Sequence, residues 1–154
     1  MKRTALAVIL LAFALSGTTF AQGKPDLSGT WALDPAKSDL GGGRRPPASV
    51  TIVLRQTPET LSIERNLGTR TETAVLKLDG SESVNKLPSG AEKKSRAKWT
   101  GSTLTSDAEA NVQGSAVKTH EVWSLSADGK VMTLDVTLQS ATGEKKQKLV
   151  YYKQ

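Results

Sequence analysis

Short segments in which apolar and polar residues alternate run through most of this chain, and turn signals separate them. Met132, Leu134, Val136 and Leu138 are apolar, and the residues between them are polar. A period of two places the apolar side chains on one face of a β-strand. The turn signals recur every ~9–15 residues, which is the strand-plus-turn spacing of all-β domains. They are Thr57-Pro58-Glu59, Asn66-Leu67-Gly68, Asp79-Gly80, Pro88-Ser89-Gly90, Thr100-Gly101-Ser102, Gln113-Gly114-Ser115, Asp128-Gly129 and Thr142-Gly143.

The segments between these turns predict an all-β domain, an up-and-down antiparallel barrel of eight to ten strands. Consecutive antiparallel strands must bury one face and protect two edges, and closing the sheet on itself does both. A β-sandwich is the alternative, although the short links leave no place for a long crossover. Only Pro35–Ser38 has the pattern of a helical turn, with Asp34 placed to cap it.

The first 21 residues have the pattern of a secretory signal peptide. Lys2 and Arg3 precede the apolar run Ala5–Leu15, and small residues at Thr19 and Ala21 precede the expected cut. The alternative is an uncleaved membrane anchor. Cleavage after Ala21 would leave residues 22–154 as the barrel domain, 154 − 21 = 133 residues. The chain has no cysteine, so it forms no disulfide and carries no lipoprotein anchor; we expect it in the periplasm or outside the cell.

Basic residues exceed acidic ones, and the net charge is +6 at pH 7. Lys94, Arg96 and Lys98 would share one strand face, as would Lys146 and Lys148, and Arg44-Arg45 lies in a Gly- and Pro-rich stretch. Such residues usually keep a barrel exterior soluble. The functional alternative is contact with an anionic envelope surface. Nucleic acid is disfavoured because no aromatic residues are interleaved with these cations, and a polar exterior disfavours a barrel that spans the membrane.

The segment Leu27-Ser28-Gly29-Thr30-Trp31-Ala32-Leu33 resembles the Gly-x-Trp opening of lipocalins and their calycin relatives. Followed by Asp34–Ser38, it is similar to secreted bacterial lipocalin-like proteins, mostly of unassigned function. The resemblance implies that Trp31 packs across the closed end of a barrel and that Gly29 and Trp31 are structural. It also implies a cup for a small apolar ligand.

No residue pattern indicates an enzyme, a metal site or a cofactor. His120 is the only histidine, and its place in the alternation points it outward. A metal site or a catalytic triad would need further partners around it, and no spacing supplies them. We therefore expect a non-catalytic monomer.

Two charged residues fall on the apolar, inward parity of their strands. Glu121 shares its face with Trp123, and Arg65 shares its face with Leu61 and Ile63. A buried charge requires a partner, so the two residues could pair with each other or with a polar ligand group. Alternatively, they reach solvent near strand ends, or a bulge shifts the register. The predicted ligand-binding residues are Arg65, Trp99, Glu121 and Trp123.

Two functions follow from this pattern. The first is binding of a small apolar or amphipathic molecule inside the barrel. The second is a filled barrel that contacts an anionic envelope surface or a protein partner through its basic outer face. Small inward residues would leave room for a ligand, and they are Ala74, Ser95, Ala97, Ser106, Ala108 and Ala110.

Overall fold

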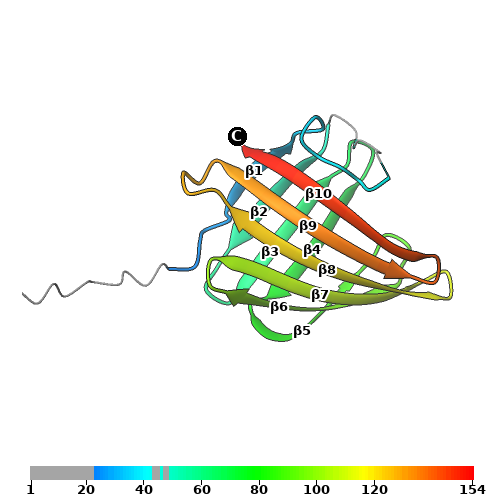
Figure 1. The fold of residues 1–154 in the computed structure, drawn as a ribbon. Helices are drawn as coiled ribbons and strands as arrows, with labels where there is room; N and C mark the ends of the chain where they lie inside the picture. The colour runs from blue at the N-terminus through cyan, green and yellow to red at the C-terminus, as the bar shows by residue number, and fades with distance from the viewer. Residues whose placement is uncertain (1–22, 43–45, 47–48) are drawn as a thin grey trace, which may run out of the picture.

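The computed structural model describes residues 23–42, 46 and 49–154, and within them the chain is an all-β barrel (Figure 1). The predicted signal peptide and Arg44-Arg45 lie outside the described residues. No helix in the described residues is long and apolar enough to cross a membrane. The ten strands are β1 (Gly29–Leu33), β2 (Thr51–Gln56), β3 (Thr60–Asn66), β4 (Thr71–Lys77), β5 (Asp79–Lys86), β6 (Glu92–Thr100), β7 (Thr103–Val112), β8 (Ser115–Leu125), β9 (Val131–Ser140) and β10 (Gly143–Lys153).

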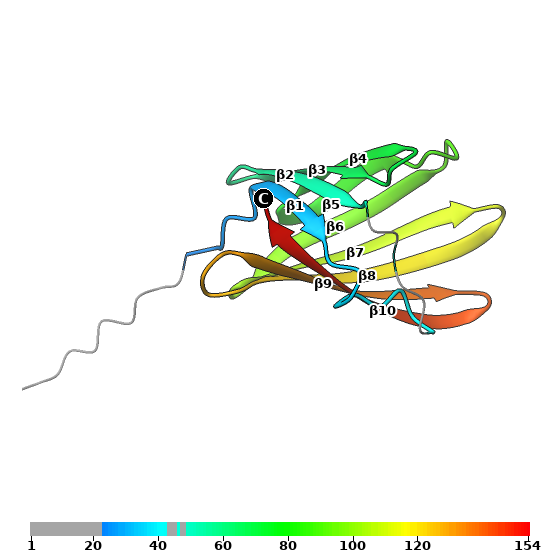
Figure 2. The ribbon, with the colours of Figure 1, turned by 90° about the horizontal axis from the view of Figure 1, so that it is seen from above.

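The strands pair in one antiparallel sheet in the order β4-β3-β2-β1-β10-β9-β8-β7-β6-β5. Almost every strand lies beside its neighbours in the chain, and β1 pairs with β10 to join the first strands to the last. Seen from above, the sheet curls so that β2–β4 lie opposite β7–β10 (Figure 2). The predicted up-and-down barrel is therefore confirmed as nearly closed, and a single continuous sheet replaces the alternative of two packed sheets.

The alternation of apolar and polar residues along each strand determines which side chains form the core. Ile52, Leu54, Leu104 and Leu134 are almost completely buried, while the residues between them point outward or are only half-buried. The turn signals separate these strands as expected except for Asp79-Gly80, which lies inside the start of β5. Gln113 and Gly114 both have positive φ, 54° and 80°, in the two-residue link between β7 and β8. This conformation matches the twist of the flanking strands.

One end of the barrel is closed by the segment that precedes β1. Trp31 is fully buried, and its indole Nε1 donates a 2.9 Å hydrogen bond to the carbonyl oxygen of Leu27, which is also buried. Gln56 holds this segment through its side chain, which accepts from the Leu27 N–H at 3.0 Å and donates to the Pro25 carbonyl at 3.0 Å. The expected structural role of Trp31 at the closed end is confirmed.

Gly29 allows the chain to enter β1 beside the last strand. Its φ is 142°, and a Cβ atom there would lie 2.8 Å from Cε of Lys153. The Lys153 ammonium in turn lies 5.3 Å from the centre of the Trp31 ring, within the range of a cation–π contact. The glycine of the Gly-x-Trp motif therefore provides both an unusual backbone angle and a close approach between β1 and β10.

After β1 the chain makes the predicted turn. The Asp34 carboxylate accepts hydrogen bonds from the N–H groups of Ala36 and Lys37, at 2.8 and 3.3 Å. The turn stops there, and Asp39 forms a short bridge with Lys148 of β10. Residues 39–41 thus lie beside β10.

Candidate ligand-binding site

A cavity of about 240 Å³ lies at the mouth formed by β3, β4, β5 and β6. Its lining comprises Ile63, Arg65, Thr71, Glu72, Thr73, Ala74, Asn85, Lys86, Leu87, Pro88 and Lys93. Most of the remaining interior is occupied by side chains, the largest being Trp31, Trp123 and Tyr151. Among the small residues expected to leave space, Ala74 lines this cavity, whereas Ser95, Ala97 and Ser106 are buried in the packed interior. In the described part of the chain the barrel is thus largely filled, and a compact opening remains at this mouth.

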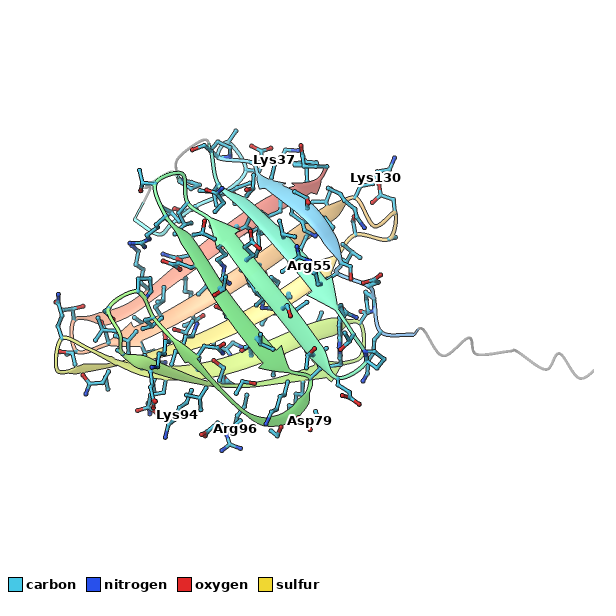
Figure 3. The ribbon with its side chains drawn as sticks, turned by 180° about the vertical axis from the view of Figure 1, so that it is seen from behind. Lys37, Arg55, Asp79, Lys94, Arg96 and Lys130 are labelled. Carbon is cyan, nitrogen blue, oxygen red and sulfur yellow. The ribbon has the colours of Figure 1, made fainter. Side chains whose placement is uncertain are left out.

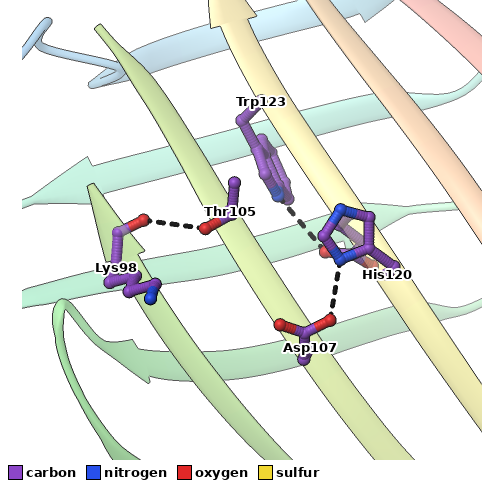
Figure 4. A network of polar contacts seen from close by, with 6 residues as sticks. Lys98, Thr105, Asp107, His120 and Trp123 are labelled. Atoms are coloured by element: carbon purple, nitrogen blue, oxygen red, sulfur yellow. Dashed lines mark hydrogen bonds and ion pairs between the residues drawn. The ribbon is translucent and has the colours of Figure 1, made fainter. Parts of the chain in front are cut away.

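Glu121 is the buried carboxylate behind this cavity. It lies on β8 and is only 7% exposed. Its Oε2 accepts a 3.2 Å hydrogen bond from the indole Nε1 of Trp123, two residues along the same strand and on the same face (Figure 4). The inward parity inferred from the sequence is therefore observed, with no bulge in the β7–β8 or β8–β9 register.

Two cations from the cavity wall converge on the other oxygen of this carboxylate. Nη2 of Arg65 lies 3.9 Å and Nζ of Lys93 lies 3.8 Å from Oε1 of Glu121. The side chains of both cations are about one-quarter exposed, at 23% and 24%. These distances are those of ion pairs and exceed hydrogen-bond lengths, so Glu121 balances one positive charge without using the N–H donors of either cation.

The guanidinium of Arg65 lies over the ring of Trp123. Cζ of Arg65 lies 5.8 Å from the centre of the Trp123 ring, and the ring itself is fully buried. A guanidinium near an aromatic face is held electrostatically while its edge stays available for hydrogen bonds. Arg65, Glu121 and Trp123 were all predicted as ligand-binding residues, and the structure brings these three together.

Sequence reasoning missed Lys93, and the structure places the predicted residue Trp99 away from this cluster. Lys93 shares its parity on β6 with Ser95 and Ala97, a signal hidden by the neighbouring outward cations at Lys94 and Arg96. Trp99 lies six positions further along β6, ~20 Å from Lys93 at the usual rise of a strand. It packs against the core instead, and its Nε1 is buried with no hydrogen-bond partner in the described part of the chain.

Tyr151 is a buried phenol whose pKa is affected by the charges of the site. It is 2% exposed on β10, and burial raises the pKa of its phenol above the ordinary value of 10.0. The charge of Arg65 opposes this rise in pKa and that of Glu121 adds to it. The pKa of the phenol therefore responds to both charges of the cluster, although the loss of solvent on burial affects this pKa most.

The outer face of β5–β9 carries a second, shallower depression of about 790 Å³. Its strands place opposite charges side by side, because Lys94 faces Glu109 and Arg96 faces Asp107, while Glu109 also faces Lys118. Figure 3 shows Lys94 and Arg96 on this exterior. The predicted basic stripe is consequently interrupted by acidic residues, and such cross-strand pairs stabilise the register of a sheet.

His120 belongs to this outer face, as its parity predicted. Its Nδ1 lies 2.7 Å from Oδ1 of Asp107, and both side chains are about half exposed or more (Figure 4). Within the described residues, no group of three histidine, cysteine or carboxylate side chains is arranged to hold a metal ion. The pair is a surface contact of the same mixed-charge pattern.

Comparison with known proteins bears on the fold. Neither a protein-family model nor a curated protein sequence matches this chain. Among solved structures, zebrafish ileal bile acid-binding protein complexed with cholic acid has a TM-score of 0.61 at 15% identity, and the match covers 83% of this chain and 98% of that one. The barrel has the lipocalin-like, calycin-type fold. Human cRBP IV matches with a TM-score of 0.57 at 17% identity, covering 84% and 99%. Caenorhabditis elegans lipid binding protein 8 matches at 0.60 and 12%, covering 83% and 95%.

Proposed function

We propose that this protein binds a small amphipathic molecule with an acidic head group, without catalysis, in the cavity between β3 and β6. The observation that carries the proposal is the convergence of Arg65 and Lys93 at the cavity wall on a single carboxylate, Glu121. Glu72 and Lys86 also line the cavity, so three cations and two carboxylates leave one excess positive charge. Cations that line a cavity and keep hydrogen-bond donors available favour a carboxylate, sulfonate or phosphate ligand.

The two ends of the ligand would make different kinds of contact with the cavity. The acidic head group accepts hydrogen bonds from Arg65 and Lys93, while Glu121 and the Trp123 ring keep the guanidinium in place. The apolar part leaves water against Ile63, Ala74 and Leu87, which line the same cavity. This is the usual composition of a small-molecule site, an apolar wall with a few placed polar groups.

The size of the cavity limits the ligand. At about 240 Å³ it lies just below the range of ~300–1,000 Å³ that is typical for drug-sized ligands. A short-chain or single-ring acid therefore suits the cavity better than a long-chain lipid. Structurally similar proteins include a bile acid-binding protein complexed with cholic acid, a fatty acid transporter and a lipid binding protein, and these support the class of ligand.

We also propose that the protein is exported, a bacterial secreted or periplasmic monomer. The support is the basic and apolar pattern of residues 1–21 and the lack of cysteine, which suits either redox state outside the cytoplasm. The ligand would then be met in the cell envelope or its surroundings.

Octanoate and octanol test the proposed function, because they share a chain and differ in charge. We expect isothermal titration calorimetry to show saturable binding of octanoate and at least tenfold weaker binding of octanol. Arg65→Gln should weaken octanoate binding about tenfold or more, since it removes a charge-assisted contact, and should leave octanol unchanged. Arg55→Gln is the matched control, because Arg55 pairs with Glu64 on the exterior.

Two outcomes would contradict the proposal. One is equal affinity of the two probes, which would show that the cations take no part. The other is no binding of octanoate by a protein whose thermal unfolding is cooperative, and this outcome would favour the filled barrel that acts through its outer face.

A further inference from the structure

Side-chain hydrogen bonds join β4 to β5, because the two strands share no backbone pairing in the described chain. They stand at the two ends of the sheet order, so the barrel closes at a seam that no strand pairing holds in the described chain. The chain passes from Lys77, the last residue of β4, to Asp79, the first of β5, through Leu78 alone. The two strands therefore meet at one corner, and the seam begins there.

Two side chains of β5 close the seam in sequence from this corner. Ser83 Oγ accepts a 2.8 Å hydrogen bond from the N–H of Lys77. Further along, the Asn85 side chain accepts from the N–H of Val75 at 2.8 Å and donates to the carbonyl oxygen of Val75 at 2.9 Å. The amide of Asn85 thus makes both hydrogen bonds that a paired residue on a neighbouring strand would make.

The cavity opens directly beyond Asn85. Thr71–Ala74 of β4 and the chain from Asn85 to Pro88 line it, together with the cations Arg65 and Lys93. The seam is therefore closed up to Asn85 and continues as cavity wall past it. An edge held by side-chain hydrogen bonds at a half-exposed position opens locally at lower cost than a strand ladder.

Two apolar side chains flank the same position on the outside. Among the described residues, Val75 and Val84 are the large hydrophobic side chains that are most exposed, at 47% and 53%. Val75 is the residue that Asn85 holds, and Val84 precedes Asn85 in the chain. The outer surface beside the seam is thus apolar, whereas the outer faces of β6 and β7 carry charged pairs.

We propose that the β4–β5 seam is the entrance of the cavity and that Asn85 is its latch. The inference rests on the proposed function. Release of the Asn85 amide from Val75 separates Thr73 and Ala74 from the end of β5. The apolar part of the ligand contacts Val75 and Val84, and the acidic part passes to Arg65 and Lys93 inside.

A thiol placed behind the seam tests the entrance without any ligand. The chain has no cysteine, so Ala74→Cys, at a cavity-lining position, carries the sole thiol. An anionic methanethiosulfonate reagent should modify this thiol on the order of tenfold faster when Asn85→Ala removes two hydrogen bonds. Asn111→Ala on the outer face of β7 is the matched control and should leave the rate unchanged. Equal rates in all three proteins would overturn the latch.

Stopped-flow tryptophan fluorescence with octanoate then separates the latch from the proposed function. Asn85→Ala should raise the association rate constant of octanoate about tenfold. If octanoate binds and its association rate does not respond to Asn85→Ala, the ligand enters elsewhere and the latch is wrong while the function stands. If octanoate does not bind but Ala74→Cys modification responds to Asn85→Ala, the latch stands and the function is wrong.

Discussion

At the scale of single residues, the interior cluster combines stability with an available charge. Glu121 lies between Arg65 and Lys93 and accepts a hydrogen bond from Trp123. A buried carboxylate is costly unless it is paired, and a lone cation in the same place would be costly as well. The cluster therefore stabilises the empty barrel, while its surplus positive charge remains for a ligand.

Replacing Glu121 by Gln should separate these two roles. The free energy of unfolding should fall by about 1–2 kcal/mol, since two half-buried cations lose their counter-ion. Octanoate affinity should rise about fivefold, because removal of a competing unit charge a few ångströms away is on the order of 1 kcal/mol. Urea unfolding and calorimetry measure the two effects. Weaker octanoate binding by Glu121→Gln would show that the carboxylate itself contacts the ligand.

Tyr151 makes the stability of the barrel sensitive to alkali. Burial raises its pKa in the folded state, so the folded protein holds the phenol proton more tightly than the unfolded chain does. The stabilisation is complete below the unfolded pKa of about 10 and is lost as pH rises through the folded pKa. We expect the free energy of unfolding to decline above pH ~10 and Tyr151→Phe to remove most of this decline.

The control for this prediction is a direct titration. In Tyr152→Phe, Tyr151 is the only tyrosine left, because the chain has two. Its ultraviolet absorbance should show ionisation at higher pH than that of a free phenol. Ionisation at the ordinary pH would mean that water reaches the hydroxyl in solution.

At the scale of elements, each end of the barrel depends on a different kind of contact. The segment before β1 closes one end through buried Leu27 and the Gln56 side chain. Towards the other end, the Asn85 side chain holds β4 to β5, and the mouth stays open beyond it. Apolar burial thus seals the end that stays closed, and a few side-chain hydrogen bonds border the end that opens.

Leu27→Ala should destabilise the barrel by about 2–4 kcal/mol, the usual cost of deleting a fully buried leucine side chain. Octanoate affinity should change little, since Leu27 belongs to the closed end. Urea unfolding measures the loss, and Val84→Ala on the outer surface beside the seam is the control, with an expected change below about 0.5 kcal/mol. A loss from Leu27→Ala no larger than that of the control would show that the segment does not seal the end in solution.

At the scale of the whole molecule, the charge pattern of the exterior bears on solubility, and the predicted leader bears on export. Acidic residues stand beside most of the basic ones on β6, β7 and β8, and this mixed surface favours a soluble monomer.

Expression of the full chain in a bacterium should yield a mature protein of 133 residues that starts at Gln22, 154 − 21. Mass spectrometry of the periplasmic fraction measures the cut. Analytical ultracentrifugation of the same material should show a monomer. A mass that retains residues 1–21 in the membrane fraction would instead identify the leader as an anchor.

The alternation of residues was enough to predict the strands, their inward faces and the up-and-down order. Turn residues such as Gln113-Gly114 act locally, and the parity of β8 alone pointed Glu121 and Trp123 inward. Parity cannot say where along a barrel two inward residues meet. Lys93 and Trp99 share a face of β6, yet only Lys93 lies at the cavity.

The sequence by itself determined the fold class, because period-two burial and turn preferences are properties of neighbouring residues. Only the tertiary structure decided which charges meet, how much of the interior is filled and where the barrel stays open. Arg65, Lys93 and Glu121 come from β3, β6 and β8, and the register and curvature of the whole sheet set the distances among them. The Asn85–Val75 contact likewise exists because the two ends of the sheet meet without a ladder, a consequence of closure that no local pattern contains.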